Sequence, residues 1–149
     1  MTPVQAAAIG SFFKAVAELE ACGVFRSSRY LGDIGEFICQ AAFPEIKLVA
    51  QLRQRGHDAF HGKDRVQIKF NNSTEGNNIN VGNPGNYEIL IVVLGPRSKL
   101  REAGHREGEF RLYWYTSAEV QAWARESGNF YCARERLASC ASKKVVQTV

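Results

Sequence analysis

Residues 56–70 read G-H-D-A-F-H-G-K-D-R-V-Q-I-K-F, two short apolar-rich runs around a cluster of turn formers at residues 61–64. Within that cluster Gly62 can take a positive φ, and the Asp64 side chain can bond the turn backbone. This pattern predicts a β-hairpin. The expected cross-strand pairs are Phe60 with Arg65, Ala59 with Val66, and Asp58 with Gln67.

Three polar side chains gather on one face of this predicted hairpin. Because side chains alternate between faces along a strand, Gln67 and Lys69 share a face, and Asp58 lies opposite Gln67 on it. One interpretation is an ordinary solvated face, which half-exposed hairpins commonly have. The other is a site for a hard divalent cation, with oxygen ligands from Asp58, Gln67 and the backbone carbonyl of Ile68. A lysine beside such a cation can activate a water or stabilise charge on a phosphate.

Length and composition predict one globular domain over residues 1–149. The chain carries 19 Lys+Arg against 15 Asp+Glu, a net charge of +4, which is compatible with a polyanionic partner. Its four cysteines show no metal-finger spacing and are expected to be reduced thiols. No stretch approaches ~18 consecutive apolar residues, and no basic segment precedes a long apolar run. The sequence therefore predicts a soluble, cytoplasmic protein with no membrane partner.

Helical periodicity marks two segments before the hairpin. Residues 2–23 begin with a capping threonine and a proline, and their apolar spacing predicts a helix that serves as packing material. Residues 31–43 predict a second helix, with Glu36 at the edge of its apolar stripe. A solvated helix glutamate is the simpler interpretation of Glu36. Residues 46–50 predict a third strand beside the hairpin, because a two-stranded hairpin alone has little stability.

Beyond the hairpin the pattern alternates between loops and regular elements. Residues 71–86 are rich in asparagine and glycine and predict a long loop. The continuous apolar run at residues 87–94 predicts a strand in the middle of a sheet. The remaining expectations are a strand at 110–115, a helix at 116–126 opened by a capping box, a helical piece at 130–141, and a frayed tail with Lys143 and Lys144.

Residues 97–109 predict a basic loop after the central strand. Arg97, Lys99 and Arg101 are candidates for contacts with nucleic-acid phosphates. The alternative is a solvated loop without a binding role.

Glu36 on a helix, then Asp58, then Gln67-Ile68-Lys69 on the following strand, resembles the PD-(D/E)XK nuclease superfamily. The resemblance spans about residues 31–123. It implies an α/β fold with a restriction-endonuclease-like core, in which helices flank a mixed central β-sheet. It also implies hydrolysis of DNA phosphodiester bonds by an endonuclease that uses Mg²⁺ or Mn²⁺, of a restriction, repair or mobile-element type.

Each of these residues takes a role from the resemblance. Asp58 would be the principal metal ligand, together with the Ile68 carbonyl and Gln67, which stands in the second acidic position. Lys69 would assist the attacking water, and Glu36 would be the helix-borne acid and a further candidate ligand. Glutamine at position 67 removes one negative charge from the site. The family also has a helix between the hairpin and a later strand, and a short helix near residues 99–103 would fill that role.

Other functions stay open at this level. A nuclease-like domain without catalysis would act as a nucleic-acid or protein-binding module, for example in a phage–host conflict. His57, His61 and His105 invite a zinc site, although the hairpin pattern does not bring His57 and His61 together. The predicted single domain includes no separate recognition domain, which favours weak sequence specificity for DNA, or a homodimer or a separate subunit that supplies the specificity.

Overall fold

The computed structural model describes residues 2–27, 29–50, 56–103 and 108–147. A six-stranded mixed sheet forms its centre, in the order β1-β2-β3-β5-β6-β8. Its strands are β1 (Ile46–Leu48), β2 (Ala59–His61), β3 (Asp64–Asn71), β5 (Ile89–Leu94), β6 (Glu109–Thr116) and β8 (Ser142–Gln147). β3 and β5 run parallel, and the other neighbouring pairs are antiparallel. The expected mixed α/β architecture is confirmed.

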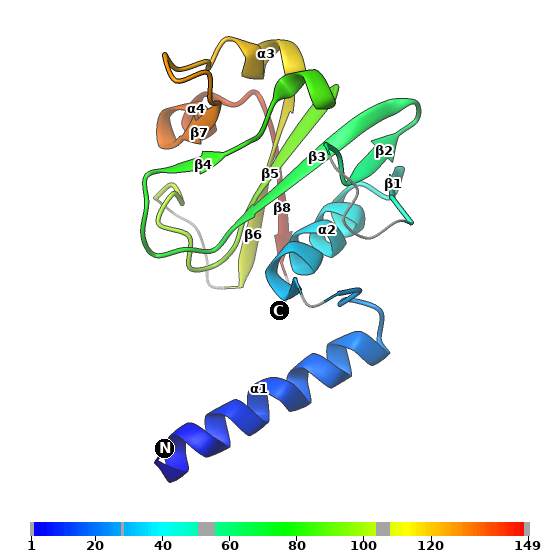
Figure 1. Ribbon diagram of the computed structural model, residues 1–149, viewed down its shortest axis with the longest axis vertical. Helices are drawn as coiled ribbons and strands as arrows, with labels where there is room; N and C mark the ends of the chain where they lie inside the picture. Colours follow the sequence, from blue (N-terminus) through cyan, green and yellow to red (C-terminus); the bar gives the residue numbers. More distant parts are fainter. Residues whose placement is uncertain (1, 28, 51–55, 104–107, 148–149) are drawn as a thin grey trace.

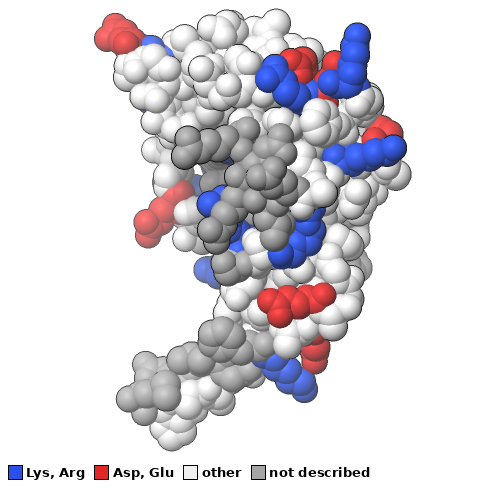
Figure 2. All heavy atoms as spheres, turned by 45° about the vertical axis from the view of Figure 1, so that its right-hand side comes forward, with Lys and Arg blue, Asp and Glu red and all other residues white. Residues whose placement is uncertain are grey.

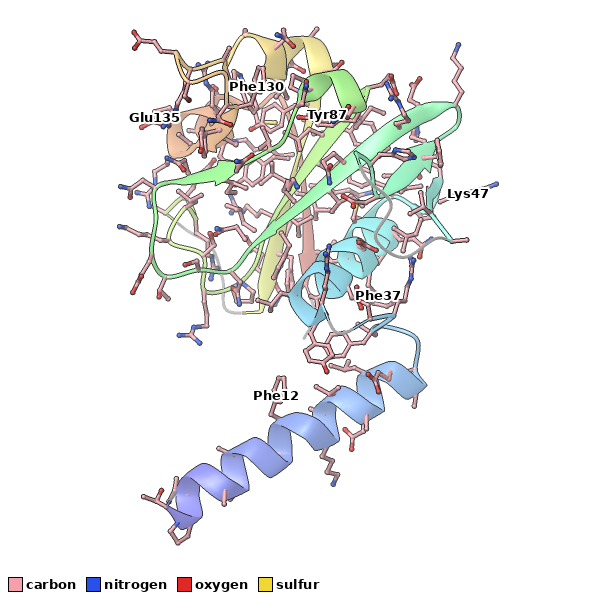
Figure 3. All side chains as sticks on the ribbon, viewed as in Figure 1. Phe12, Phe37, Lys47, Tyr87, Phe130 and Glu135 are labelled. Atoms are coloured by element: carbon pink, nitrogen blue, oxygen red, sulfur yellow. The ribbon has the colours of Figure 1, made fainter. Side chains whose placement is uncertain are left out.

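Both faces of the sheet are covered (Figure 1). One face carries α2 (Tyr30–Ala42), whose buried side chains join those of the sheet in one hydrophobic cluster. The opposite face is covered by β4 (Asn78–Asn80), η1 (Pro84–Asn86), α3 (Ser117–Gln121), β7 (Tyr131–Ala133) and α4 (Arg134–Ser139). Tyr87 and Phe130 pack within this second cluster (Figure 3). β4 and β7 form a separate two-stranded sheet.

β5 is the strand on which both clusters depend. All six of its side chains are buried, and they alternate between the two hydrophobic clusters. A strand that is apolar at every position is stable only where both of its faces are covered. The central position predicted for this apolar run is therefore confirmed.

The predicted hairpin is present with the expected register. Phe60 pairs with Arg65, and Ala59 pairs with Val66 across β2 and β3. Gly62 takes a φ of 60° in the connecting turn, a conformation that glycine adopts without steric penalty. β2 ends its pairing at Val66, whereas β3 continues beside β5 to Asn71. Among the described residues, the second half of β3 therefore has a neighbouring strand on one side only.

α2 lies unusually close to this half of β3. A Cβ atom added at Gly35 would stand 2.6 Å from the Cβ of Phe70, so only glycine permits the approach. Glu36 follows Gly35 directly, and the close contact brings its backbone to the end of β3 where Lys69 lies. The glycine thus determines how near the helix-borne acid comes to the strand.

The first helix differs from the expectation. α1 (Pro3–Ala21) forms as predicted, but it extends away from the sheet instead of packing along it (Figure 1). Val4 is 79% exposed and Phe12 is 50% exposed, whereas Val16 is buried. α2 already covers the neighbouring face of the sheet, and the Phe12 ring packs against Tyr30, with ring centroids 5.9 Å apart. Figure 3 shows Phe12 on the helix that extends away from the sheet. Among the described residues, no helix has the length and apolar character needed to cross a membrane.

Four expectations in the second half of the chain were wrong, wholly or in part. Residues 99–103 form turns and no helix, since Ser98 donates to the Gly95 carbonyl and Arg101 to the Ser98 carbonyl. The capping box at Thr116 and Glu119 is present, but α3 ends at Gln121. The expected helix at 130–141 divides into β7 and α4. The expected frayed tail is strand β8, because the outer edge of β6 offers backbone groups that its residues pair with.

Gly35 and Gly32 provide a matched test of this packing. Gly35→Ala is expected to lower the free energy of unfolding by about 1–3 kcal/mol, because the new methyl group overlaps the Phe70 side chain. Gly32→Ala meets only the Arg29 Cβ, at 3.9 Å, and is expected to raise it by up to about 1 kcal/mol through helix propensity. Urea unfolding measures both values. Equal effects of the two substitutions would contradict the close approach.

Candidate functional site

A pocket of about 660 Å³ lies between the start of α2 and the second half of β3. Glu36, Asp58, Gln67, Ile68 and Lys69 all line it. The structure thus brings the side chains predicted from the hairpin and from the helix to one place.

Asp58 stands directly before β2, at the point where β3 loses its second neighbour. Its backbone N–H donates to the Val66 carbonyl at 2.8 Å, so the hairpin register places it. Its carboxylate Oδ2 accepts a hydrogen bond from the Ile68 N–H at 2.8 Å. A buried backbone donor on a strand edge needs an acceptor, and here the carboxylate replaces the missing strand.

The Gln67 side chain joins two oxygen atoms of the pocket. Its Nε2 donates to Asp58 Oδ2 and lies 3.4 Å from the Ile68 carbonyl oxygen. Two oxygens that converge on one positively polarised group form a donor set that also suits a hard cation. Glu36 adds a second carboxylate to the same pocket.

The oxygen atoms of the pocket are of the type that the metal implied by the resemblance would need. Asp58, Glu36 and the Ile68 carbonyl offer oxygen atoms only, which fits Mg²⁺ or Mn²⁺. Within the described residues there is no group of three His, Cys, Asp or Glu side chains arranged to hold a metal. Position 67 contributes an amide to the pocket, not a third carboxylate beside Asp58 and Glu36. The residues fit a cation held by two carboxylates and backbone or amide oxygens.

Glu36 is the most strongly perturbed acid of the pocket. Its side chain is 23% exposed, so the interpretation as a solvated glutamate does not hold. Burial, with the negative charge of Asp58 as the second cause, raises the pKa of Glu36 to about 7. Arg26 Nη1 lies 3.7 Å from its Oε2 and acts in the opposite direction. At neutral pH the Glu36 carboxyl group therefore exists in both protonation states.

Burial also raises the pKa of Asp58. The hydrogen bond from the Ile68 amide opposes this shift, as do the nearby positive charges of Lys69 and Arg29. Lys69 is thus close enough to interact electrostatically with the carboxylate that would hold a cation.

A third acid of the lining, Asp33, has a structural role. It is 5% exposed, and its carboxylate accepts hydrogen bonds from the N–H groups of Arg26 and Ser27 at 2.7 and 2.6 Å. The Ser27 hydroxyl donates to it as well, at 3.1 Å. These bonds close the segment before α2 and occupy the carboxylate, so Asp33 is a positioning group and not a ligand.

The three basic residues predicted as phosphate contacts separate in space. Arg97 lines the pocket. Lys99 lines a different depression, beside Arg134, and the Arg101 guanidinium donates to the Pro96 carbonyl within its own turn. Lys99 and Arg101 are therefore not part of the pocket that holds Asp58.

Sequence reasoning missed several residues of the lining. Arg29, Asn71, Asn72 and Ser73 all belong to it. Arg29 lies between the two segments predicted as helices, where the sequence pattern predicted no functional role. The position of Asn71 and Asn72, directly after the Gln67-Ile68-Lys69 strand, was the one available signal that the long loop begins at the site.

The histidines do not form a zinc site among the residues that the structure describes. The His57 ring packs on Phe60 at 4.8 Å, and the His61 ring packs on Trp114 at 5.4 Å. His105 lies outside the described residues.

The surface charge is mixed on the face shown in Figure 2. Lys and Arg side chains occur there in several places, with Asp and Glu side chains between them. The net charge of +4 therefore does not produce one continuous basic surface on this face.

The pKa of Glu36 leads to a prediction about stability. A glutamate with a raised pKa in the folded state binds its proton more tightly there than in the unfolded chain, so its contribution to stability falls as pH rises from about 4.5 to about 7. Glu36→Gln removes the buried charge and is expected to stabilise the protein at pH 8 by about 1–3 kcal/mol, with almost no effect at pH 4. Urea unfolding at the two pH values measures the difference. Equal effects at both would show that the Glu36 pKa is close to that of a free glutamate.

No protein-family model matches this chain, and a search of curated proteins finds no significant match.

Proposed function

We propose that this protein is a metal-dependent endonuclease that hydrolyses phosphodiester bonds of DNA. The observation that carries the proposal is the convergence of Glu36, Asp58, Gln67 and Lys69 in one pocket. These residues come from a helix, the residue before a hairpin strand, and the next strand, and only the fold joins them. The parallel pair β3–β5, with α2 packed beside it, is compatible with a restriction-endonuclease-like core.

The chain supplies oxygen ligands and a lysine for this chemistry. The Asp58 carboxylate and the Ile68 carbonyl would hold Mg²⁺ or Mn²⁺, with Gln67 or Glu36 completing the protein ligands. When bound, such a cation lowers the pKa of a water and stabilises negative charge on a phosphate.

Lys69 would stabilise negative charge on the phosphate, and Glu36 would take up the proton of the attacking water. The Lys69 ammonium lies on the same face of β3 as Gln67 and would orient the attacking water and the phosphate oxygen. Glu36 has a pKa of about 7, so near neutral pH its carboxylate can accept a proton from that water. Its acid form can then donate a proton to the oxygen that leaves the phosphate.

A second candidate function rests on the Gln67 amide. Its Nε2 contacts both Asp58 and the Ile68 carbonyl, so the two oxygens are satisfied without a cation. A pocket that is internally satisfied in this way suits a nuclease-like domain that binds nucleic acid or a protein without cleaving it. Cleavage assays and cation binding distinguish the two functions.

Lys69→Ala tests catalysis. The substitution removes a group that would stabilise charge in the transition state but leaves Asp58 in place, so cleavage of DNA is expected to slow by about 100-fold or more. DNA binding is expected to change little, because the loss is confined to the transition state. Cleavage rates with Mg²⁺ and Mn²⁺ on supercoiled, linear, single-stranded and branched DNA provide the measurement.

Lys63→Ala is the matched control for this experiment. Lys63 is an exposed lysine in the turn of the same hairpin and does not line the pocket, so its removal is expected to leave the cleavage rate unchanged. If the unsubstituted protein is inert on every DNA with either cation yet binds DNA, the binding-module function is correct instead.

Gln67→Glu tests the cation site without relying on activity. The substitution places a third carboxylate beside Asp58 and Glu36, so mutual repulsion is expected to lower the melting temperature in EDTA. Added Mg²⁺ or Mn²⁺ is expected to bind more tightly than in the unsubstituted protein and to restore the melting temperature. Calorimetric titration and thermal melts measure both effects. A variant with no response to either cation would argue against a metal at this pocket.

A further inference from the structure

Two arginines line the pocket, and within the described part of the chain neither guanidinium makes a hydrogen bond or an ion pair. Arg29 precedes α2, and Arg97 lies in the turn between β5 and β6. Lys69 of β3 lines the same pocket. Three cationic side chains from three different parts of the chain thus meet at one pocket.

The backbone of Arg97 is tied to the end of β3. Asn72 Oδ1 accepts a hydrogen bond from the Arg97 N–H at 2.7 Å, and the Asn71 carbonyl accepts one from the Gly95 N–H at 2.8 Å. A Cβ added at Gly95 would stand 2.6 Å from Asn72 Oδ1, so the turn packs directly against this asparagine. The position of Arg97 is therefore coupled to the strand that carries Lys69.

A second set of hydrogen bonds, at the start of α2, holds the backbone of Arg29. Its N–H donates to the Ser27 hydroxyl at 3.0 Å, and that hydroxyl donates to the carboxylate of buried Asp33. The Asp33 N–H in turn donates to the Arg29 carbonyl at 3.1 Å, which closes the first turn of α2. Both arginines thus project from hydrogen-bonded turns while their guanidinium groups remain available for an anion.

We infer that Arg29 and Arg97 bind two different phosphates of one nucleic-acid strand, on either side of the phosphate held near Asp58 and Lys69. This inference deepens the proposed nuclease function and rests on it. Guanidinium groups pair with phosphate oxygens in a bidentate geometry, and two of them from different parts of the chain suit an extended polyanion. The substrate class is therefore an internal phosphodiester of a strand, not a free nucleotide or a terminal phosphate ester.

The charge of the pocket is consistent with this assignment. Asp58 and Glu36 would repel a phosphate, but Arg29, Arg97 and Lys69 line the same pocket and would attract it. The positive charge of Arg29 already acts on the Asp58 carboxylate. A strand bound in the pocket would thus meet three cationic side chains beside the two acidic groups.

The test measures binding in EDTA, where no cleavage takes place. A labelled single-stranded oligothymidylate is titrated by fluorescence anisotropy at several salt concentrations. Arg29→Ala and Arg97→Ala are each expected to weaken binding and to reduce the salt slope by about 0.7, the value for one lost phosphate contact on a single strand. The double variant is expected to lose about twice that slope, because the two contacts are on different phosphates. Lys47→Ala, which removes an exposed lysine of β1 outside the pocket, is expected to leave the slope unchanged.

Strand length provides the second arm of the test. In competition experiments with oligothymidylates from dinucleotide to hexanucleotide, affinity is expected to rise with each phosphate until the strand reaches both arginines. In either single variant the rise is expected to stop one phosphate earlier. An oligoribonucleotide of the same length carries the same phosphates and is expected to show the same dependence on the two arginines.

The outcomes separate this inference from the proposed function. If Lys69→Ala abolishes cleavage while Arg29→Ala and Arg97→Ala keep the unsubstituted salt slope, the nuclease function stands and the two-arginine assignment is wrong. A loss at Lys99→Ala as large as that at Arg97→Ala would also overturn the assignment, since it would place the strand over the whole loop. If the unsubstituted protein binds no strand of any length, both proposals fail.

Discussion

The hydrogen bond between the Asp58 carboxylate and the Ile68 N–H is the interaction on which the rest of the site depends. β2 leaves β3 after Val66, so the backbone donor of Ile68 would otherwise be buried without an acceptor. The carboxylate takes the place of the missing strand and is held at the edge of the sheet. The same break in strand pairing creates the space that becomes the pocket. The early end of the β2–β3 pairing thus positions the Asp58 carboxylate and leaves open the space that it faces.

Close packing supplies the second half of the arrangement. Gly35 lets α2 approach Phe70, and this approach brings Glu36 into a partly buried position near Asp58. Burial raises the pKa of Glu36 to about 7, and repulsion by the negative charge of Asp58 adds to this shift. A cation would reduce this repulsion between the two carboxyl groups, and so would a proton or the Gln67 amide. The pocket therefore favours positively polarised groups at its centre, whichever of the two proposed functions is correct.

The sequence predicted the local parts of this arrangement well. Residues 61–64 predicted the hairpin turn and, through the length of that turn, the register of the two strands, because both depend on neighbours a few residues apart. The apolar run of β5 predicted a central strand for the same reason. Elements with weak local signals were less predictable. β8 forms where a frayed tail was expected, because its pairing with β6 depends on a partner distant in the sequence.

The sequence by itself determined which chemical groups were available: an acid before a strand, Gln67 and Lys69 two residues apart on one face, and an acid on a preceding helix. Only the tertiary structure decided which of the basic residues join them. Arg97 reaches the pocket through the hydrogen bond of its N–H to Asn72, whereas Lys99, two residues later, lies elsewhere. The physical reason is that strand and helix periodicity act over a few residues. The position of a turn relative to a pocket depends instead on long-range hydrogen bonds and close contacts, which leave no periodic trace in the sequence.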